Sequence, residues 1–243
     1  MKTAAMKVEF IDHMGTDLTV VNAARVSFDK TSEWDGIVTF PDPQDPEASC
    51  WAHKLSDKDA KLIKYLADHN HWSPFAHTSI QLRVKAPVFV ARQLVKHQVG
   101  GVWNEVSRRY VDSEPEFWFP DTWRGRPAGS MKQGSSGVVD LPDHFVQYLD
   151  VNLKPIDAVQ LSVNMYNHML ECGVAPEQAR MMLPQNMMTE WYWTGSLMFF
   201  VRVCRERLDP HAQQETREVA EGIAEIVAPL FPVSWSALME VKK

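Results

Sequence analysis

The residues best suited to chemistry lie together between positions 92 and 110. Side chains with charged, amide or hydroxyl groups in this stretch are Arg92, Gln93, Lys96, His97, Gln98, Asn104, Glu105, Ser107, Arg108, Arg109 and Tyr110. Residues four apart share one face of a helix, so Arg92 with Lys96 and Gln93 with His97 would form two neighbouring polar ridges. Pro87 suits a first helical position, so the helix that carries these ridges is expected over residues 87–97. Half of that helix cannot be simple core.

Two features beyond this helix indicate a phosphorylated ligand. Gly100 and Gly101 would let backbone N–H groups approach a ligand closely. The guanidinium groups of Arg108 and Arg109 match the oxygens of a phosphate. The alternative is an amphipathic helix whose cations lie in water, and periodicity alone does not separate the two interpretations. The glycines and the arginine pair favour a phosphorylated small molecule.

The same stretch resembles the signature of the flavin-dependent thymidylate synthases (ThyX). The matching residues are 86–98 (APVFVARQLVKHQ) and 104–110 (NEVSRRY). Other matching blocks occur in the family's order and approximate spacing, at residues 23–28, 71–77, 179–184 and 207–213. The resemblance covers most of the chain apart from the loops.

This resemblance implies a homotetramer of α+β subunits with active sites shared between chains. Each subunit would be a single domain over residues 1–243, with a mixed or antiparallel sheet packed by helices. The implied ligands are dUMP as substrate, 5,10-methylenetetrahydrofolate as one-carbon donor, bound FAD, and NADPH as reductant. The residues implied to surround dUMP are Gln93, Leu94, Val95, Lys96, Glu105, Val106, Ser107, Arg108, Arg109, Arg180 and Arg207. Those implied to contact the cofactor are His71, Ser73, Lys96, His97, Gln98, Glu105, Ser196 and Arg202, with His71 near flavin and folate.

The sequence departs from the family pattern in two places. The usual Arg-His-Arg triplet is Lys96-His97-Gln98 here, and the loop from His97 to Asn104 is one residue longer, so one cation facing the flavin is missing. In the second place, Ser196 and Arg202 stand where asparagines commonly contact FAD. Arg202 would be a candidate to restore the missing charge.

Methylation at C5 of uracil requires added electron density at that carbon. Ordinary thymidylate synthases supply it by adding a cysteine thiolate to C6, but Cys50, Cys172 and Cys204 all lack a polar, catalytic sequence context. The resemblance instead makes Arg207 catalytic, because its permanent charge can stabilise the uracil anion formed when the N3 proton leaves. Arg109 and Arg180 would hold the phosphate, and Ser107 would hydrogen-bond the nucleotide, since no base is evident beside it.

Composition restricts the classes of partner. The chain has 243 residues and a net charge of -6, so it lacks the overall positive field that attracts nucleic acid or an anionic membrane. It contains no run of about 18 apolar residues, and its three cysteines are isolated. We therefore expect a cytoplasmic protein without nucleic-acid or membrane partners. His69, His71 and His77 cluster without a carboxylate at ligand spacing, so no metal site is predicted.

Periodicity predicts the elements that position these residues. Strands are expected over residues 8–12 and 78–84, with loops over 29–49 and 121–140 and a turn over 71–77. Helices are expected over residues 17–25, 57–70, 155–172, 176–183 and 189–207, with a last one from 209. Ser56 is expected to cap one of these helices and Gly173 to end another.

Two other functions stay open. The altered triplet allows a flavin- and folate-dependent enzyme that hydroxymethylates dUMP or acts on another pyrimidine nucleotide. A non-catalytic nucleotide- or RNA-binding module could use Lys96, Arg108 and Arg109, but the acidic charge and the lack of aromatics interleaved on a basic face disfavour it. Flavin content and product analysis would separate the three functions.

Overall fold

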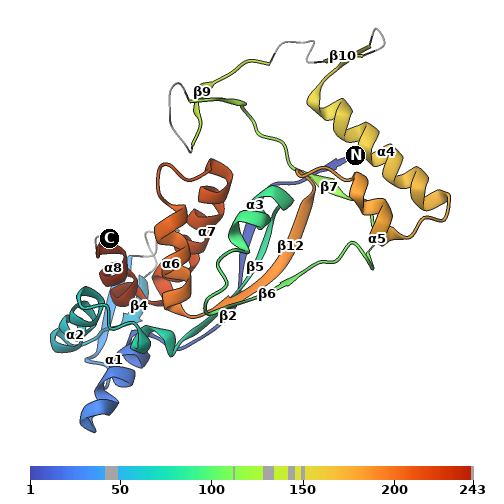
Figure 1. The fold of residues 1–243 in the computed structure, drawn as a ribbon. Helices are drawn as coiled ribbons and strands as arrows, with labels where there is room; N and C mark the ends of the chain where they lie inside the picture. Colours follow the sequence, from blue (N-terminus) through green and yellow to red (C-terminus); the bar gives the residue numbers. More distant parts are fainter. Residues whose placement is uncertain (42–48, 112, 128–133, 142–145, 149–150, 242–243) are drawn as a thin grey trace.

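The fold is built on a four-stranded antiparallel sheet with strand order β2-β5-β12-β6 (Figure 1). The computed structural model describes residues 1–41, 49–111, 113–127, 134–141, 146–148 and 151–241. The strands are β2 (Lys7–Met14), β5 (Ser79–Pro87), β6 (Gly101–Glu105) and β12 (Met188–Gly195). The α+β class and the antiparallel sheet expected from the resemblance are confirmed.

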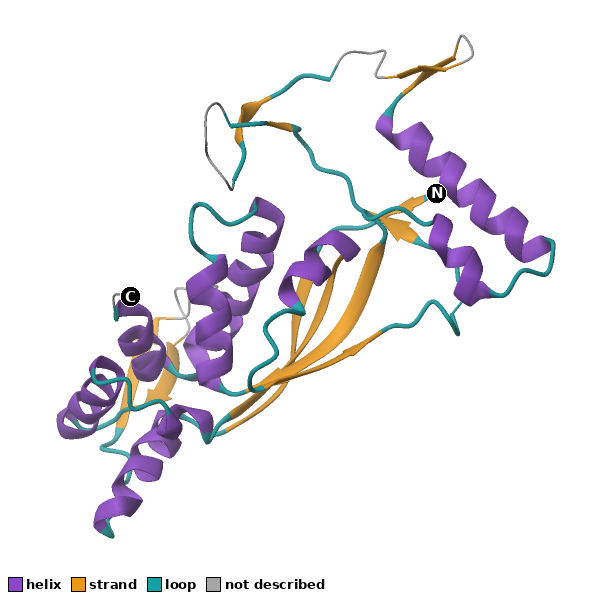
Figure 2. Cartoon of the chain, viewed as in Figure 1, coloured by secondary structure: helices purple, strands orange, loops and turns teal. Residues whose placement is uncertain are grey.

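One face of this sheet is covered by helices. Ile80, Leu82 and Val84 alternate along β5 and are completely buried, whereas Arg83 between them is exposed. The helices on the buried face are α3 (Val88–Leu94), α6 (Leu197–Arg207) and α7 (Gln214–Leu230), which lie on the same side of the sheet in Figure 2. The alternation expected over residues 78–84 is therefore confirmed, and it sets the side on which α3 packs.

A helical layer continues the core beyond one end of the sheet. It contains α1 (Asp17–Arg25), α2 (Asp57–Asp68) and α8 (Pro232–Glu240), which contact one another. Asp17 is 3% exposed and accepts hydrogen bonds from the backbone N–H groups of Val233 and Ser234, both at 2.9 Å. A carboxylate at this position satisfies N–H groups that the first turn of α8 leaves unpaired. The 3-10 turns η1 (Val26–Phe28) and η2 (Ser73–Ala76) adjoin this layer.

A second, smaller apolar cluster lies beyond the opposite end of the sheet. Phe117, Val159 and Val163 are buried there, between β7 (Glu116–Phe117) and α4 (Pro155–Glu171). Helix α4 contacts α5 (Pro176–Ala179) and the 3-10 turn η3 (Arg180–Met182). The remaining strands form pairs: β1 (Lys2–Thr3) with β7, β3 (Ile37–Pro41) with β4 (Ser49–His53), β8 (Arg124–Gly125) with β9 (Ser136–Val138), and β10 (Val146–Tyr148) with β11 (Val151–Leu153).

Several predicted elements are confirmed. The strand predicted over residues 8–12 lies within β2, and Ser56 caps α2 by accepting a hydrogen bond from the N–H of Asp59 at 3.2 Å. Helix α4 ends where predicted, and Gly173 has a φ of 82°, which suits glycine after a helix. None of the helices in the described ranges is long and apolar enough to cross a bilayer.

The helix predicted over residues 189–207 is wrong in its first half. Residues 188–195 form β12, an inner strand of the sheet, and α6 begins at Leu197 after the cap residue Ser196. Trp191 and Trp193 are buried and Tyr192 between them is exposed, which is strand alternation. Aromatic and β-branched residues favour a strand here, and pairing with β5 and β6 on both sides outweighs helical propensity.

Other boundaries also differ from the prediction. The loop expected over 29–49 contains β3, whose partner β4 starts at Ser49, and residues 42–48 lie outside the described part. The loop expected over 121–140 includes the paired strands β8 and β9, while 128–133 is not described. The last predicted helix begins at Gln214 rather than 209, and α8 follows it. Strand β6 was not predicted.

Candidate active site

Helix α3 connects the two parts of the candidate site. It is shorter than the predicted range of 87–97, and Pro87 is its extended N-cap residue rather than its first helical residue. Val90, Ala91 and Leu94 face the core, whereas Arg92 is exposed and Gln93 is half-buried. Since consecutive helical residues project about 100° apart, Arg92 and Gln93 reach different surroundings.

Arg92 lines a groove that we call the arginine groove. This groove has a volume of about 650 Å³, and its three arginines are Arg92, Arg108 and Arg180. The arginines come from α3, from the segment after β6, and from η3. Glu105 and Val106 line the same groove, so the structure brings together five of the residues predicted to surround the substrate or shape its helix.

Acidic side chains also line this groove, but most of them already have partners. Hydrogen bonds or ion pairs join Glu105 to Thr189 (2.6 Å), Glu114 to Lys2 (3.1 Å), Glu116 to Lys85, and Glu190 to Arg83. By contrast, no ion pair joins Arg92, Arg108 or Arg180 to a carboxylate within the described residues. Arg108 donates to the carbonyl of Ser113 and Arg180 to that of Glu177, at 3.1 Å. The groove therefore offers guanidinium groups to an anion such as phosphate.

The second part of the site is a polar cluster at the ends of α3 and α6, the Arg207 cluster. It consists of Gln93, His97, Arg207, Gln213 and Thr216. Nε of Arg207 donates to Nε2 of His97 at 2.9 Å, and Nη2 lies 3.5 Å from the carbonyl oxygen of Gln93. The side chain of Gln93 donates to Gln213 and accepts from Thr216 Oγ1 at 3.3 Å. Arg207 is therefore anchored on one side to a fixed polar frame.

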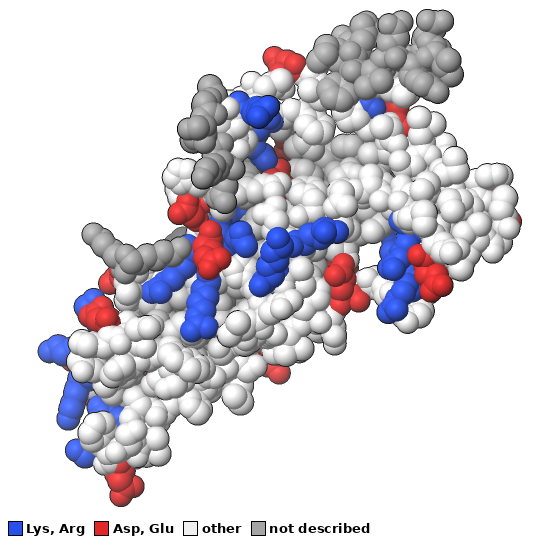
Figure 3. Space-filling model, viewed as in Figure 1, with Lys and Arg blue, Asp and Glu red and all other residues white. Residues whose placement is uncertain are grey.

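His97 is neutral in this cluster. Burial lowers the pKa of its ring and the charge of Arg207 lowers it further, while Glu206 acts in the opposite direction. An imidazole that accepts from a guanidinium must have its lone pair on Nε2, so the proton lies on Nδ1. Figure 3 shows that lysine and arginine side chains gather on this face over α3 and α6.

Other predicted substrate residues lie outside these two parts. Leu94 is completely buried in the core, and Val95 is half-buried. Ser107 accepts hydrogen bonds from the backbone N–H of Arg109 at 3.3 Å and from its Nε at 3.1 Å. The guanidinium of Arg109 also lies over the ring of Tyr110, 4.9 Å from its centroid. Arg108 rather than Arg109 thus lines the arginine groove.

The predicted cofactor residues supply hydrogen-bond donors. Ser73, Lys96, Gln98 and Arg202 are exposed, and in the described part of the chain their side chains form no hydrogen bond or ion pair. Donors of this kind fit the phosphate and carbonyl oxygens of a flavin dinucleotide. Ser196 differs, because its hydroxyl accepts from the N–H of Phe199 at 3.3 Å and so caps α6. His71 is exposed, and its ring packs edge-on against Tyr65.

The two glycines at the start of β6, Gly100 just before it and Gly101 as its first residue, have structural reasons of their own. Gly100 has a φ of 84°, which favours glycine. A Cβ on Gly101 would lie 2.4 Å from the ring of Phe199, and one on Gly195, its partner across the strands, would lie 2.2 Å from the same ring. Ring packing therefore explains Gly101 without a ligand.

Sequence reasoning missed several residues that support the site. Gln213 is not among the residues expected at the site, and the structure places its side chain between Gln93 and Glu215. Thr189, which holds Glu105, was assigned to a helix, and the alternation of residues 188–195 was the signal that could have identified it as a strand residue.

A one-sided antiparallel sheet with an arginine groove and a second, anchored arginine defines an α+β protein suited to an anionic nucleotide. The chain belongs to the family described as "Thymidylate synthase complementing protein", whose sequence pattern matches residues 9–233.

Relatives and solved structures agree with this assignment. A flavin-dependent thymidylate synthase from Thermus thermophilus is 38% identical over 96% of this chain and 75% of its own length. The enzyme of the same name from Kosmotoga olearia is 34% identical over 96% of this chain and 89% of its own. Crystal structures of the UMP/dUMP methylase PolB from Streptomyces cacaoi, bound with 5-Br dUMP or 5-Br UMP, have a TM-score of 0.76. The 5-Br dUMP structure is 26% identical and covers 99% of this chain and 98% of that one.

Proposed function

We propose that this chain is a flavin-dependent thymidylate synthase that methylates dUMP to dTMP. The observation that carries the proposal is a groove with three arginines that lack carboxylate partners among the described residues. Helix α3 links this groove to the Arg207 cluster, because Arg92 lines the groove and the following residue, Gln93, belongs to the cluster. Family membership and the names of the relatives support the reaction.

The arginine groove is the proposed phosphate site. Arg92, Arg108 and Arg180 can each donate two N–H groups to phosphate oxygens, and in the part of the chain that the structure describes no carboxylate pairs with them. Glu105 is held by Thr189 on one oxygen and by Nε1 of Trp103 on the other, at 3.2 Å. This carboxylate is thus oriented as an acceptor for a donor group of the nucleotide.

Arg207 is the proposed catalytic residue. Its Nε donates to His97 and its Nη2 lies 3.5 Å from the carbonyl oxygen of Gln93, so Nη1 is the group that we propose faces the uracil ring. A permanent charge there stabilises the anion formed on loss of the N3 proton, which raises electron density at C5.

The cysteines do not supply an alternative nucleophile. Cys204 is buried in α6, and burial raises the pKa of its thiol to about 12, so it stays protonated and unreactive. Cys172 lies at the end of α4 and Cys50 lies in β4, and neither lines the arginine groove.

The cofactors and the assembly complete the proposal. Bound FAD would supply the hydride that completes the methyl group, after reduction by NADPH, with 5,10-methylenetetrahydrofolate as the carbon donor. The FAD would be held by hydrogen-bond donors on Lys96, Gln98, Ser73 and Arg202. His71 would lie beside the flavin and the folate. We also propose a homotetramer with shared sites, which the uncovered face of the sheet around Arg83 and Tyr192 supports.

A second substrate is favoured by one observation. PolB, which resembles this chain over nearly its whole length, is described as a UMP/dUMP methylase and binds 5-Br UMP as well as 5-Br dUMP. Another pyrimidine nucleotide, UMP, is therefore the alternative substrate. Release of the C5 proton from dUMP and from UMP, with identification of each product, separates the two.

The test uses purified protein with FAD, NADPH and methylenetetrahydrofolate. We expect a flavin spectrum, release of the C5 proton of dUMP, and formation of dTMP. Arg207→Ala should lower kcat by a factor of about 100 to 1,000, the loss seen when one stabilising donor is removed from a reacting oxyanion. Cys204→Ala is the matched control and should retain turnover. Protein that cannot be reconstituted with flavin, or activity lost only in the cysteine variant, would reject the proposal.

A further inference from the structure

The guanidinium of Arg207 is held at its Nε atom by a single side chain. Nε2 of His97 lies 2.9 Å from this atom, and the carbonyl oxygen of Gln93 lies 3.5 Å from Nη2. A bond at Nε fixes the plane of the guanidinium and leaves its outer N–H groups in that plane. A planar acceptor such as a uracil edge needs this orientation.

We propose that His97 is a positioning residue for Arg207, acting as a neutral acceptor that orients the guanidinium toward the pyrimidine. This inference rests on the proposed function, because it assigns a role within that same site. It adds to the flavin contact expected for His97, since the ring uses Nε2 for Arg207 and retains Nδ1.

The frame around His97 is rigid enough for this role. The backbone N–H of His97 donates to the carbonyl of Leu94 at 3.0 Å, which ties the ring's residue to the end of α3. The Gln93 side chain forms hydrogen bonds with Gln213, the residue just before α7, and with Thr216 in the first turn of α7. The two acceptors of Arg207, the His97 ring and the Gln93 carbonyl, therefore belong to residues that make further hydrogen bonds within the protein.

Protonation of the ring would release this contact. A protonated imidazole is a donor at both nitrogens and would face the guanidinium with a like charge. The charged groups around the ring are Arg207 and Glu206 from α6, with the carboxylate of Glu206 at 3.9 Å, and Lys96 beside it in the chain. Burial and Arg207 lower the pKa of His97, so its acceptor form is maintained at neutral pH. The orientation, and with it kcat, should fall as the pH drops through the lowered pKa.

The first test does not depend on activity. NMR of the purified protein should show the Nδ1–H tautomer of His97 at neutral pH. Arg207→Ala should raise the pKa of the ring, because a neighbouring positive charge is removed, and Glu206→Gln should lower it, because a negative charge is removed. A ring whose titration is unchanged in both variants, or an Nε2–H tautomer, would overturn the proposal.

The second test is the pH profile of kcat for flavin-saturated enzyme. His97→Ala should lower kcat about 10-fold to 100-fold, the range for a hydrogen bond to a charged group. His97→Gln should recover part of that loss, because its amide oxygen accepts a hydrogen bond, and should lack the acid limb. Glu206→Gln should move the acid limb to lower pH.

Three results would count against the role. These are an unchanged kcat in His97→Ala, an acid limb that persists in His97→Gln, or variants whose only defect is lost flavin. Wild-type protein that titrates as described but does not turn over dUMP would instead reject the proposed function and leave the contact intact.

Discussion

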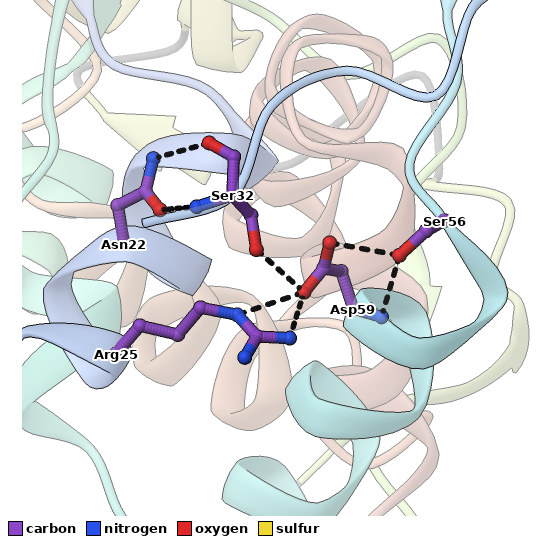
Figure 4. A network of polar contacts seen from close by, with 5 residues as sticks. All are labelled: Asn22, Arg25, Ser32, Ser56 and Asp59. Carbon is purple, nitrogen blue, oxygen red and sulfur yellow. Dashed lines mark hydrogen bonds and ion pairs between the residues drawn. The ribbon is translucent and has the colours of Figure 1, made fainter. Parts of the chain in front are cut away.

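Two groups of arginines in this protein have opposite surroundings. Arg25 lies beside Asp59, a carboxylate that is only 3% exposed (Figure 4). Asp59 accepts from Arg25 at Nε (3.0 Å) and Nη2, from Ser32 Oγ (3.0 Å) and from Ser56 Oγ (2.8 Å). The arginines of the groove have no carboxylate partner among the residues described.

The first group is used within the fold, whereas the groove arginines are the ones that we propose bind a ligand. A buried carboxylate is tolerated when donors surround it, and both oxygens of Asp59 accept hydrogen bonds within the protein. Asn22 extends this network by bonding the backbone of Ser32 through both ends of its amide, at 2.7 Å and 3.1 Å. The groove arginines take part in no comparable network with a carboxylate among the described residues. Residues in both groups match the family pattern, so the match alone does not distinguish the two roles.

The largest effect, a loss of stability, should come from removing the carboxylate of Asp59 that holds Arg25. Asp59→Ala would leave Arg25 without its partner and Ser32 and Ser56 without their acceptor. We expect a loss of about 3–5 kcal/mol in the free energy of unfolding, measured in urea. Lys64→Ala is the control, because its pair with Glu240 is exposed on both sides and should contribute less than about 1 kcal/mol. Equal losses in the two variants would erase the distinction.

A smaller effect, in binding rather than stability, should follow removal of a groove arginine. Arg180→Ala should weaken dUMP binding by about 10-fold to 100-fold, since a charged hydrogen bond is lost, and this can be measured by calorimetry. The free energy of unfolding should change by no more than about 0.5 kcal/mol. Lys58→Ala, an exposed cation on α2, should leave dUMP affinity unchanged. Normal affinity in Arg180→Ala would remove the phosphate site from the groove.

The smallest effect should appear in the pH dependence of stability. Burial raises the pKa of Asp59, but hydrogen bonds from Arg25, Ser56 and Ser32 outweigh it, so the folded pKa lies below the unfolded one. The stabilisation is therefore present above the unfolded pKa, about 3.9, and is lost as the pH falls through the folded pKa. Asp59→Asn should make the free energy of unfolding less dependent on pH between about 7 and about 3.

Asp17 also contributes to the pH dependence of stability, so wild type and Asp59→Asn must be compared at the same pH. Burial raises its pKa despite its bonds to Ser234 and Val233, so its contribution decreases as the pH rises and has the opposite sign. The difference between wild type and Asp59→Asn at each pH isolates Asp59. An identical acid slope in wild type and variant would contradict the assignment, and Arg180→Ala should keep the wild-type slope.

Predictions from the sequence were correct where the structure of an element depends on residues close to it in the chain. The alternation of Ile80, Leu82 and Val84 identified β5, and the sequence at Ser56 identified a cap, because both depend on residues close in the chain. The helix prediction for residues 188–195 was wrong, because this segment is a strand stabilised by β5 and β6 on its two sides, and both partners are far away in the sequence. The prediction of a loop over residues 29–49 was wrong at β3, whose partner strand β4 begins at Ser49.

The sequence by itself determined the chemistry that this protein can attempt. The density of polar groups between Arg92 and Tyr110 indicated an anionic small molecule, and the matching blocks indicated the family, because residue types and spacing are sufficient for both. Only the tertiary structure decided which arginines share a groove, that His97 contacts Arg207 across more than a hundred residues of chain, and that Arg25 is structural. These pairings depend on how helices pack on one face of the sheet, and packing is a property of the whole fold.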